Sequence, residues 1–596
     1  MLSPMMILTM MYLKMSDNQF YTNERAQQIL IAVLKANNIK KVVASPGTAS
    51  MSLIVSMEHD GAFEMYSSID ERSAAYIACG LSAESGEPVV LVCTEATASR
   101  NYGPGLTEAF YRKLPILAVT GSHGEHLIGQ LQPQVIDRRT IANDVANLDV
   151  RVHMIKDNDD EWLTTLRINQ AVLELQRHGG GPVHLDIETH GGKDFSVKEI
   201  APVKIIRRYT LKDALPELPK GMIGIFVGSH LLFSKELEAA IDAFCAAHDA
   251  VVFCDQTSNY YGKYRVNYSI IASQEKYITK RNVLDLVINI GEVSGEYWHI
   301  SSKNTWRINE DGEIRDMFRR SLTSVFEMPE LDFFKQYIPT SFDSKDMLLR
   351  EYKEEIDYAI SSLPDLPFSN AWIAQQLHDK MPADSYLHFA ILNSLRAWNL
   401  FDAPQVKMSS CNVGGFGIDG CLSTVLGASL AHPDKLHFAF IGDLAFFYDM
   451  NALGNRHLGN NLRILLTNNG KGTEFRMYWH PAAQFGDDAD HYVAAGGHFG
   501  NKSPNVVKSY VESLGFEYIS AASKKEFCAN YEHFIASEKY EKPIVFEVFT
   551  ANEDETKSIY DIRNTLEDDG YRSRMIKKQA KDTVKTIIKG AKHLIP

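Results

Sequence analysis

Short apolar runs alternate with helical segments along most of the chain, and this alternation constrains the fold more than any other feature. The runs KKVVASPG, EPVVLVCTEAT, LPILAVTGS and GPVHLDIE each have a short apolar core and contain or end on glycine, serine, threonine or aspartate. The segments between them, such as 25–37 and 72–85, have the spacing of amphipathic helices. Strand–helix alternation of this kind predicts parallel sheets covered by helices.

The pattern recurs three times over the 596 residues of the chain. That length corresponds to about three to four domains. We predict an α/β protein of three doubly wound parallel-sheet domains, the outer two of which are the stronger candidates for a ligand site. The predicted boundaries are an N-terminal extension (1–19), three domains (20–195, 196–365 and 366–555) and a C-terminal tail (556–596).

Composition narrows the class of protein. A net charge of -14 argues against a nucleic-acid-binding protein, which would usually present a basic face. The seven cysteines are scattered without a CxxC pair, which favours reduced thiols in the cytoplasm over a disulfide framework or a zinc site. Residues 1–14 are apolar but lack the cationic segment and cleavage site of a signal peptide, so we interpret them as an extension upstream of Met15.

The end of the chain differs from the rest. Residues 571–596 carry eight Lys/Arg side chains against one acid, and their apolar residues fall on one helical face. A basic amphipathic helix can lie on an anionic membrane surface, so peripheral membrane contact is one interpretation. The other is that this helix docks on the acidic body of the protein or on a sister subunit.

Two neighbouring apolar runs, 438–441 and 462–466, both end on small polar groups. Asp443 and Asn469 follow them, with a crossover helix predicted around 449–457. In a parallel sheet both side chains then lie at the same carboxyl edge, where ligands bind. Carboxylate and amide oxygens suit Mg²⁺ or Ca²⁺, and the carbonyl of Lys471 can add a third ligand. The alternative is that Asp443 only caps the following helix.

Glycines surround this pair. Gly442, Gly470 and Gly472 have no side chain to obstruct a ligand, so a diphosphate can approach the backbone closely there.

The spacing of GD and NN at these positions resembles the signature of thiamine diphosphate enzymes, although Leu444 stands where a third glycine is usual. GDLAFFYDMNAL, FGIDGCLSTVLGA, LNSLRAW and SSIDERSAAYIACGLSAESGEPVV resemble segments of the menaquinone-pathway synthases that make 2-succinyl-5-enolpyruvyl-6-hydroxy-3-cyclohexene-1-carboxylate. The likeness covers roughly 20–190 and 366–550. It implies thiamine diphosphate and Mg²⁺ as cofactors. It also implies an enzyme that decarboxylates a 2-oxo acid and adds the acyl anion to a carbonyl or enone acceptor.

The resemblance assigns roles to individual residues. Glu71 matches the glutamate that shares a proton with the aminopyrimidine ring, and burial would raise the pKa of such a carboxyl. Ile418 matches the bulky residue beneath the bent cofactor. The implied cofactor contacts are Glu71, Ile418, Gly442, Asp443, Leu444, Asn469 and Gly472, and the implied metal ligands are Asp443, Asn469 and Lys471.

Two of these assignments have ordinary structural alternatives. Glu71 can be a first-turn acid favoured by the helix dipole, and Ile418 can be plain core. Because the family draws the glutamate and the metal site from different subunits, the resemblance also implies a homodimer or a dimer of dimers.

The substrate arginines of the menaquinone-pathway synthases are missing. Ala49 (in SPGTA), His123 (in GSH) and Val413 (in NVG) replace three of them, and a fourth falls on Trp398. Since bidentate arginines read carboxylates, their loss argues against isochorismate and 2-oxoglutarate as the exact substrate pair. The retained or neighbouring candidates for substrate contacts are Gln134, Ser394, Arg396 and His123.

Other cations can replace the lost arginines, although each can equally be a solvated surface charge. These candidates are Arg100, Arg138, Arg139, Lys471, Arg476 and His480. The leading hypothesis is a C–C bond-forming synthase with a small 2-oxo acid as donor. The alternatives are a simple 2-oxo acid decarboxylase and a non-catalytic relative that binds thiamine diphosphate.

Overall fold

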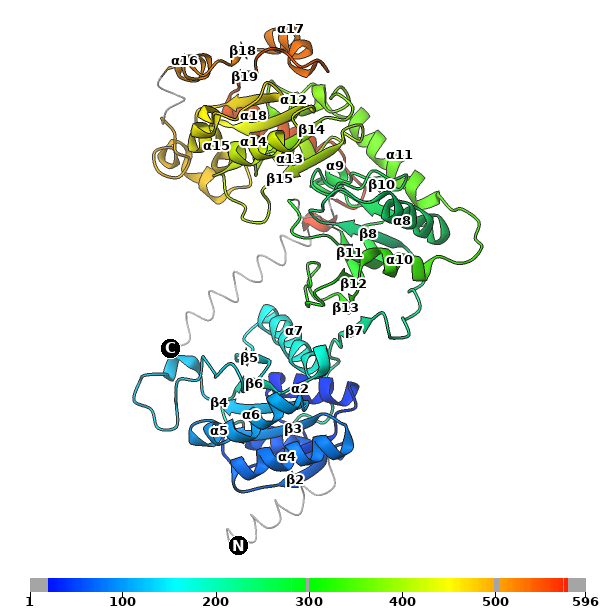
Figure 1. Ribbon diagram of the computed structural model, residues 1–596, viewed down its shortest axis with the longest axis vertical. Helices are drawn as coiled ribbons and strands as arrows, with labels where there is room; N and C mark the ends of the chain where they lie inside the picture. Colours follow the sequence, from blue (N-terminus) through cyan, green and yellow to red (C-terminus); the bar gives the residue numbers. More distant parts are fainter. Residues whose placement is uncertain (1–19, 280, 296–299, 498–502, 572, 577–596) are drawn as a thin grey trace. The chain divides into compact units, whose positions relative to one another are not determined.

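The computed structural model describes residues 20–576 except 280, 296–299, 498–502 and 572. It contains three β-sheets with helices between the strands, which confirms the predicted α/β class (Figure 1). The chain divides into two compact units, one comprising residues up to Thr210 with Gly312–Val325 and the other comprising Leu211–Asp311 with Phe326 onward. The domain boundaries inferred from the sequence stay a prediction.

The first sheet has six parallel strands in the order β2-β1-β3-β4-β6-β5. Its strands are β1 (Lys41–Ala44), β2 (Glu64–Ser67), β3 (Val89–Thr94), β4 (Ile116–Ser122), β5 (Leu148–Val152) and β6 (Val183–Glu188). Its helices are α2 (Arg25–Ala36), α3 (Met51–Asp60), α4 (Glu71–Ser85), α5 (Thr97–Asn101), α6 (Gly103–Arg112) and α7 (Asn158–Glu174), with 3₁₀ turns η1 (Glu125–Leu127) and η2 (Arg177–Gly179).

Alternate residues of these strands enter two different cores. Val90 and Val92 pack with residues of α2, α3 and α7, whereas Leu91 and Cys93 pack with residues of α4 and α6. Successive side chains of a strand point to opposite faces, so a strand that is apolar throughout is buried on both. The continuous apolar runs of the sequence are therefore explained by helices on both faces of this sheet.

The second sheet has seven strands in the order β10-β9-β8-β11-β12-β13-β7. Its strands are β7 (Arg207–Thr210), β8 (Ile223–Val227), β9 (Val251–Phe253), β10 (Arg265–Val266), β11 (Val283–Ile290), β12 (Ser301–Asn309) and β13 (Leu322–Glu327). The helices of this region are α8 (Lys235–His248), α9 (Ser269–Ala272), α10 (Glu330–Tyr337) and α11 (Met347–Ser361).

The third sheet has six parallel strands in the order β15-β14-β16-β17-β19-β18. Its strands are β14 (Tyr386–Phe389), β15 (Met408–Cys411), β16 (His437–Gly442), β17 (Leu462–Asn468), β18 (Glu517–Ala521) and β19 (Ile544–Phe549). Its helices are α12 (Asn370–Leu377), α13 (Asn393–Asn399), α14 (Cys421–Ala431), α15 (Asp443–Asp449), α16 (Val506–Ser513), α17 (Lys524–Ile535) and α18 (Asn552–Arg563), with 3₁₀ turns η3 (Met450–Gly454), η4 (Thr473–Arg476) and η5 (Pro481–Ala489).

The first and third sheets share one topology. If β1 is matched to β14, every other strand of the first sheet finds its counterpart at the same place in the third. The pair β3 and β4 then corresponds to the pair β16 and β17. The repetition visible in the sequence pattern is therefore a repetition of strand order, without a repeat of residues.

One helix begins earlier than the sequence predicted. The crossover helix expected around 449–457 is α15, which starts at Asp443 and ends at Asp449 before the 3₁₀ turn η3. The extended backbone of Gly442 (φ −81°, ψ 163°) ends β16 and caps the helix in one residue, so no loop separates the two elements.

Two further predictions concern the chain ends and the cysteines. In the described part of the chain, no helix is both long enough and apolar enough to cross a membrane. The predicted N-terminal extension and most of the basic 571–596 segment lie outside the described residues. All seven cysteines are free thiols, as their spacing predicted.

Candidate functional site

Asp443 links the ends of β16 and β17. Its Oδ1 accepts a hydrogen bond from the Leu444 backbone N–H at 2.8 Å, and its Oδ2 accepts one from the Gly470 N–H at 2.6 Å. The residue is 4% exposed. It is the first residue of α15, and Gly442 is the N-cap, so the side chain does not cap the helix in the usual way.

The carboxyl of Asp443 lies in a buried environment that favours a bound cation. Burial raises the pKa of Asp443 to about 6, against the opposing effect of the backbone N–H donors. Among the described residues, no basic side chain forms an ion pair with it. A buried carboxylate without a counter-charge is costly, and a divalent ion would supply that charge.

The loop after β17 supplies the other predicted ligands. The Asn469 carbonyl accepts a hydrogen bond from Asn552 Nδ2 at 3.1 Å, and the Lys471 ammonium pairs with Asp490. The described residues contain no cluster of three His, Cys, Asp or Glu side chains that could hold a metal. A cation here would therefore depend on the Asn469 amide and the Lys471 carbonyl beside the one carboxylate, a donor set that suits Mg²⁺.

Two glycines keep the backbone of this loop close to its neighbours. Gly470 has φ +80°, a conformation that side chains disfavour. A Cβ on Gly472 would lie 3.0 Å from the Phe475 ring and 3.3 Å from Leu444 Cδ1. Leu444, the residue that stands where the signature usually has a third glycine, thus fills the space beside Gly472.

Glu71 is the first residue of α4, the helix that follows β2 of the first sheet. Asp70 caps the helix by accepting from the Arg72 N–H, and Asn101 Nδ2 donates to Glu71 Oε2 at 3.2 Å. The Glu71 side chain is half-buried, not fully buried as a proton-holding glutamate was expected to be. Tyr76 and Ile77 of the same helix are exposed, so this face of α4 has apolar side chains that the described chain leaves uncovered.

The residues predicted near the substrate fall in different settings. Ile418 is half-buried and packs against the core of the third sheet, and Gln134 lies in an exposed loop. Ser394 is buried on α13, the helix that also carries Arg396. Arg396 donates to Glu474 Oε2 at 2.5 Å, so its charge is already paired within the third sheet's domain.

Three of the four positions where the resemblance implies arginine are buried, and His123 is the exception. Trp398 is fully buried and lies 4.1 Å from the Phe440 ring, centroid to centroid. Ala49 and Val413 are also buried. These three positions are therefore apolar packing positions, which no longer present a cation.

The six alternative cations all contact groups of the protein itself. Arg138 pairs with Asp186 at 2.9 Å and is nearly buried, and Arg100 donates to the Asp137 carbonyl at 3.0 Å. The remaining contacts are Arg139 with Asp137, Arg476 with Asp487, Lys471 with Asp490, and His480 with the Ala482 N–H.

Three buried acids near the strand ends escaped the sequence analysis. Glu95 follows β3 directly, and Glu547 accepts from Asn468 Nδ2 and from the Tyr518 hydroxyl, each at 2.7 Å. Glu555, on α18, accepts from the Asn370 N–H at 3.1 Å and from Thr550 Oγ1 at 2.7 Å. The signal available in the sequence for Glu95 was an acid directly after an apolar strand, as at Asp443.

Glu555 makes the stability of the protein depend on pH. Burial raises the pKa of Glu555 to about 7 from its usual 4.5. The folded protein therefore holds a proton that the unfolded chain releases. The contribution of this group to the stability of the fold is fully present below about pH 4.5 and is lost as pH rises through about 7. The free energy of unfolding should therefore fall as pH rises, and we expect Glu555→Gln to reduce this fall by up to about 3 kcal/mol.

The measurement is the melting temperature at about pH 5 and about pH 8. Glu553→Gln, at an exposed position two residues earlier on the same helix, is the control and should keep the wild-type dependence. An unchanged dependence in Glu555→Gln would show that this carboxyl is ionised in the fold at both pH values.

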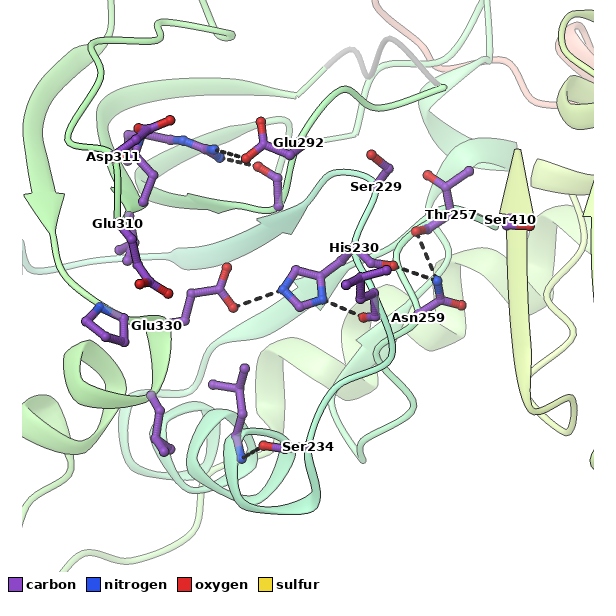
Figure 2. Close-up of a pocket in the computed structure, with 18 of the residues that line it drawn as sticks. Ser229, His230, Ser234, Thr257, Asn259, Glu292, Glu310, Asp311, Glu330 and Ser410 are labelled. Atoms are coloured by element: carbon purple, nitrogen blue, oxygen red, sulfur yellow. Dashed lines mark hydrogen bonds and ion pairs between the residues drawn. The ribbon is translucent and has the colours of Figure 1, made fainter. Parts of the chain in front are cut away.

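A separate cavity of about 840 Å³ lies at the carboxyl edge of the second sheet (Figure 2). His230 lies on its wall, with Nε2 3.2 Å from Glu330 Oε2 and Nδ1 2.6 Å from the Leu231 carbonyl. Glu292, Glu310 and Asp311 also line it. None of the residues predicted to bind the cofactor lines this cavity, and the sequence pattern predicts no site here.

The sequence of this chain is similar to those of thiamine diphosphate enzymes, as its motifs predicted. Residues 24–141 match the family model "Thiamine pyrophosphate enzyme, N-terminal TPP binding domain". The chain is 29% identical over 578 residues to the 2-succinyl-5-enolpyruvyl-6-hydroxy-3-cyclohexene-1-carboxylate synthase of Bacteroides fragilis, covering 92% of this chain and 100% of that protein. Synthases of the same name from Phocaeicola vulgatus and Christiangramia forsetii are 28% and 24% identical, over 90% and 89% of this chain and 97% and 96% of theirs.

These similarities run through the whole length of the relatives and include the segment that holds Glu71. The strand order shared by the first and third sheets places Glu71 and Asp443 at the carboxyl edges of two equivalent domains. The chain is thus similar to the thiamine diphosphate-dependent enzymes over residues 24–141 and to the 2-succinyl-5-enolpyruvyl-6-hydroxy-3-cyclohexene-1-carboxylate synthases over most of its length.

Proposed function

We propose that the protein is a thiamine diphosphate- and Mg²⁺-dependent enzyme that decarboxylates a 2-oxo acid and adds the resulting acyl group to a carbonyl or enone acceptor. The observation that carries this proposal is the buried Asp443 carboxylate, which joins the ends of β16 and β17 without a basic partner among the described residues. Its setting is that of a metal–diphosphate site at the carboxyl edge of a parallel sheet.

In this proposal the residues around Asp443 hold the cofactor's diphosphate. Asp443, the Asn469 amide and the Lys471 carbonyl would hold Mg²⁺, which would supply positive charge for the diphosphate. Gly442 has open space where a Cβ would be, so a phosphate can approach the backbone there. When bound, thiamine diphosphate supplies the carbon nucleophile and the electron sink for decarboxylation.

Glu71 holds a proton for the aminopyrimidine ring of the cofactor. Its carboxyl is fixed by Asn101, and a second copy of the chain would complete its burial. The exposed, adjacent Tyr76 and Ile77 on the same helix support a homodimer or a dimer of dimers, because contiguous exposed apolar surface is typical of protein interfaces.

The substrate differs from that of the menaquinone-pathway synthases. Trp398, Ala49 and Val413 are buried apolar residues at positions where the resemblance implies arginine. A pocket without these guanidiniums lacks the bidentate groups that read carboxylates. We propose a small 2-oxo acid donor, such as pyruvate or 2-oxoglutarate, with an acceptor that carries fewer carboxylates.

The test is turnover of a panel of 2-oxo acids, each with and without aldehyde and ketone acceptors. We expect CO₂ release that requires thiamine diphosphate and Mg²⁺, together with a new C–C product whose mass is the sum of donor and acceptor less CO₂. CO₂ release without such a product would favour the simple decarboxylase. No CO₂ release despite bound cofactor would favour a non-catalytic relative.

A further inference from the structure

The first sheet has an acid at the point equivalent to Asp443. Glu95 follows β3 directly, and its Oε1 accepts from the His123 backbone N–H, just after β4, at 3.1 Å. Asp443 follows β16 directly and accepts from the N–H of Gly470, just after β17. Since β3 and β4 correspond to β16 and β17, each outer domain uses a carboxylate to join the same two strand ends.

Glu95 also holds the imidazole of His123. Glu95 is 2% exposed, and its Oε1 lies against His123 Nδ1. An ionised carboxylate only accepts hydrogen bonds, so Nδ1 carries a proton and donates a hydrogen bond to Glu95. The other ring nitrogen, Nε2, is then available on a side chain that is 43% exposed. A carboxylate that fixes one imidazole nitrogen in this way sets the tautomer and the direction of the other.

The backbone around Glu95 is held in one conformation. Ala96 has φ +62° and ψ −137°, which is strained for a residue other than glycine, and such strain persists where the surroundings enforce it. A Cβ on Gly121 would lie 2.3 Å from the Ala49 carbonyl oxygen, so the 45–49 loop lies directly on the end of β4. The backbone that carries Glu95 is also held against the end of β4, since the Glu95 N–H donates to the Gly121 carbonyl at 3.0 Å.

Helix α5 connects this pair to Glu71. It starts at Thr97, two residues after Glu95, and ends at Asn101, whose Nδ2 donates to Glu71 Oε2. The His123–Glu95 pair and the proposed proton-holding glutamate thus occupy the same carboxyl edge of the first sheet.

We propose that His123 is a catalytic residue that donates a proton to the acceptor, that Glu95 is its positioning residue, and that the acceptor presents an uncharged carbonyl at this point. The proposal rests on the proposed function. An imidazolium paired with a carboxylate has little net charge. It therefore attracts a substrate carboxylate much less strongly than an arginine would. It retains one donor, Nε2–H, which suits a carbonyl oxygen that becomes a hydroxyl.

The step balances with the proposed reaction. The electron pair of the donor's bond to its carboxylate stays on the acyl carbon as CO₂ leaves, and this carbon bonds to the acceptor's carbonyl carbon. The acceptor's C=O π electrons move to its oxygen, which takes the Nε2 proton. His123 is left neutral with Nδ1–H still donating to Glu95. Its exposed ring then regains a proton from water, which accounts for the one proton that the overall reaction consumes.

The first test separates the two products of the reaction. We expect His123→Gln to lower formation of the C–C product by about 10²–10³-fold, the usual contribution of a general acid, with much less effect on CO₂ release in the absence of acceptor. Glu95→Ala should lose product formation to a similar extent. Glu95→Gln retains an acceptor oxygen and should recover part of it. His126→Gln, an exposed histidine of the same loop, is the matched control and should behave as wild type.

The second test needs no turnover. In holoenzyme labelled with [¹⁵N]histidine, the His123 signal is identified by its absence in His123→Gln. In alkaline buffer, where the ring is neutral and has a single N–H, we expect the Nδ1–H form in wild type and in Glu95→Gln, and a shift toward Nε2–H in Glu95→Ala. Melting temperatures show whether each variant is folded.

The outcomes separate this proposal from the function on which it rests. Full product formation by His123→Gln, or an Nε2–H tautomer in wild type, would overturn the role of the pair. A wild-type enzyme that releases no CO₂ from any 2-oxo acid would overturn the proposed function, while the tautomer would still decide whether Glu95 positions the ring. A preference for acceptors that carry a carboxylate beside the carbonyl would contradict the acceptor class.

Discussion

Glu71→Gln is expected to lower kcat for 2-oxo acid turnover by about 10²–10⁴-fold, the range that a positioned acid–base group contributes. Glutamine keeps the size of the side chain and can still accept a hydrogen bond from Asn101 Nδ2, but it has no exchangeable carboxyl proton. The fold should not change, because Asp70 and not Glu71 caps α4. The variant should therefore still bind thiamine diphosphate while CO₂ release nearly stops.

Single-turnover CO₂ release and cofactor binding by calorimetry measure the two effects separately. Glu84→Gln is the control, since Glu84 is exposed on the same helix and lies away from its first turn. If Glu71→Gln kept wild-type turnover, Glu71 would be only a first-turn acid that interacts with the helix dipole. A loss of cofactor binding along with turnover would instead assign Glu71 to binding.

Asp443→Asn is expected to abolish Mg²⁺-dependent retention of the cofactor. The change removes the one carboxylate of the proposed metal site. Asparagine has a single acceptor oxygen, so it can accept from only one of the Leu444 and Gly470 N–H groups. With cofactor and Mg²⁺ at about 100 times Kd, wild-type protein should gain about 2.7 kcal/mol of stability. That corresponds to a rise of about 5–10 °C in Tm for the domain concerned. The variant should gain almost none.

Two readouts distinguish the loss of the metal site from a damaged fold. The variant without ligands should melt close to apo wild type, because the lost hydrogen bond to one backbone N–H is offset by the removal of a carboxylate that burial disfavours as an anion. Asp434→Asn, at an exposed position before β16, should retain the full ligand-induced shift. Dialysed Asp443→Asn protein that still held stoichiometric cofactor would remove Asp443 from the site.

Much of the fold could be predicted from local sequence pattern. The continuous apolar runs at β3, β4, β16 and β17 are what a strand buried on both faces requires, so the α/β class follows from them directly. The start of α15 was misplaced, since whether a helix follows a strand after one residue or seven depends on the conformation of Gly442, which the pattern does not encode.

The site was predicted unevenly. Asp443 was found because an acid after an apolar run at a turn is a local signal, and Glu71 because the segment around it resembles a known family. Glu95 gives the same local signal as Asp443, but its meaning depends on His123, which is 28 residues further along the chain. Arg396 was chosen as a substrate cation, whereas Glu474, 78 residues away, already pairs with it.

The sequence by itself determined the alternation of strands and helices, the polar residues at strand ends and the family that the chain resembles, because these depend on residues close together in the chain. The tertiary structure alone decided that the first and third sheets share a strand order and that Asp443 and Glu95 occupy equivalent places in them. It also decided that Trp398 is core and that the alternative cations are paired. Burial and partner choice depend on which distant segments pack together, and that packing is set by the assembled sheets.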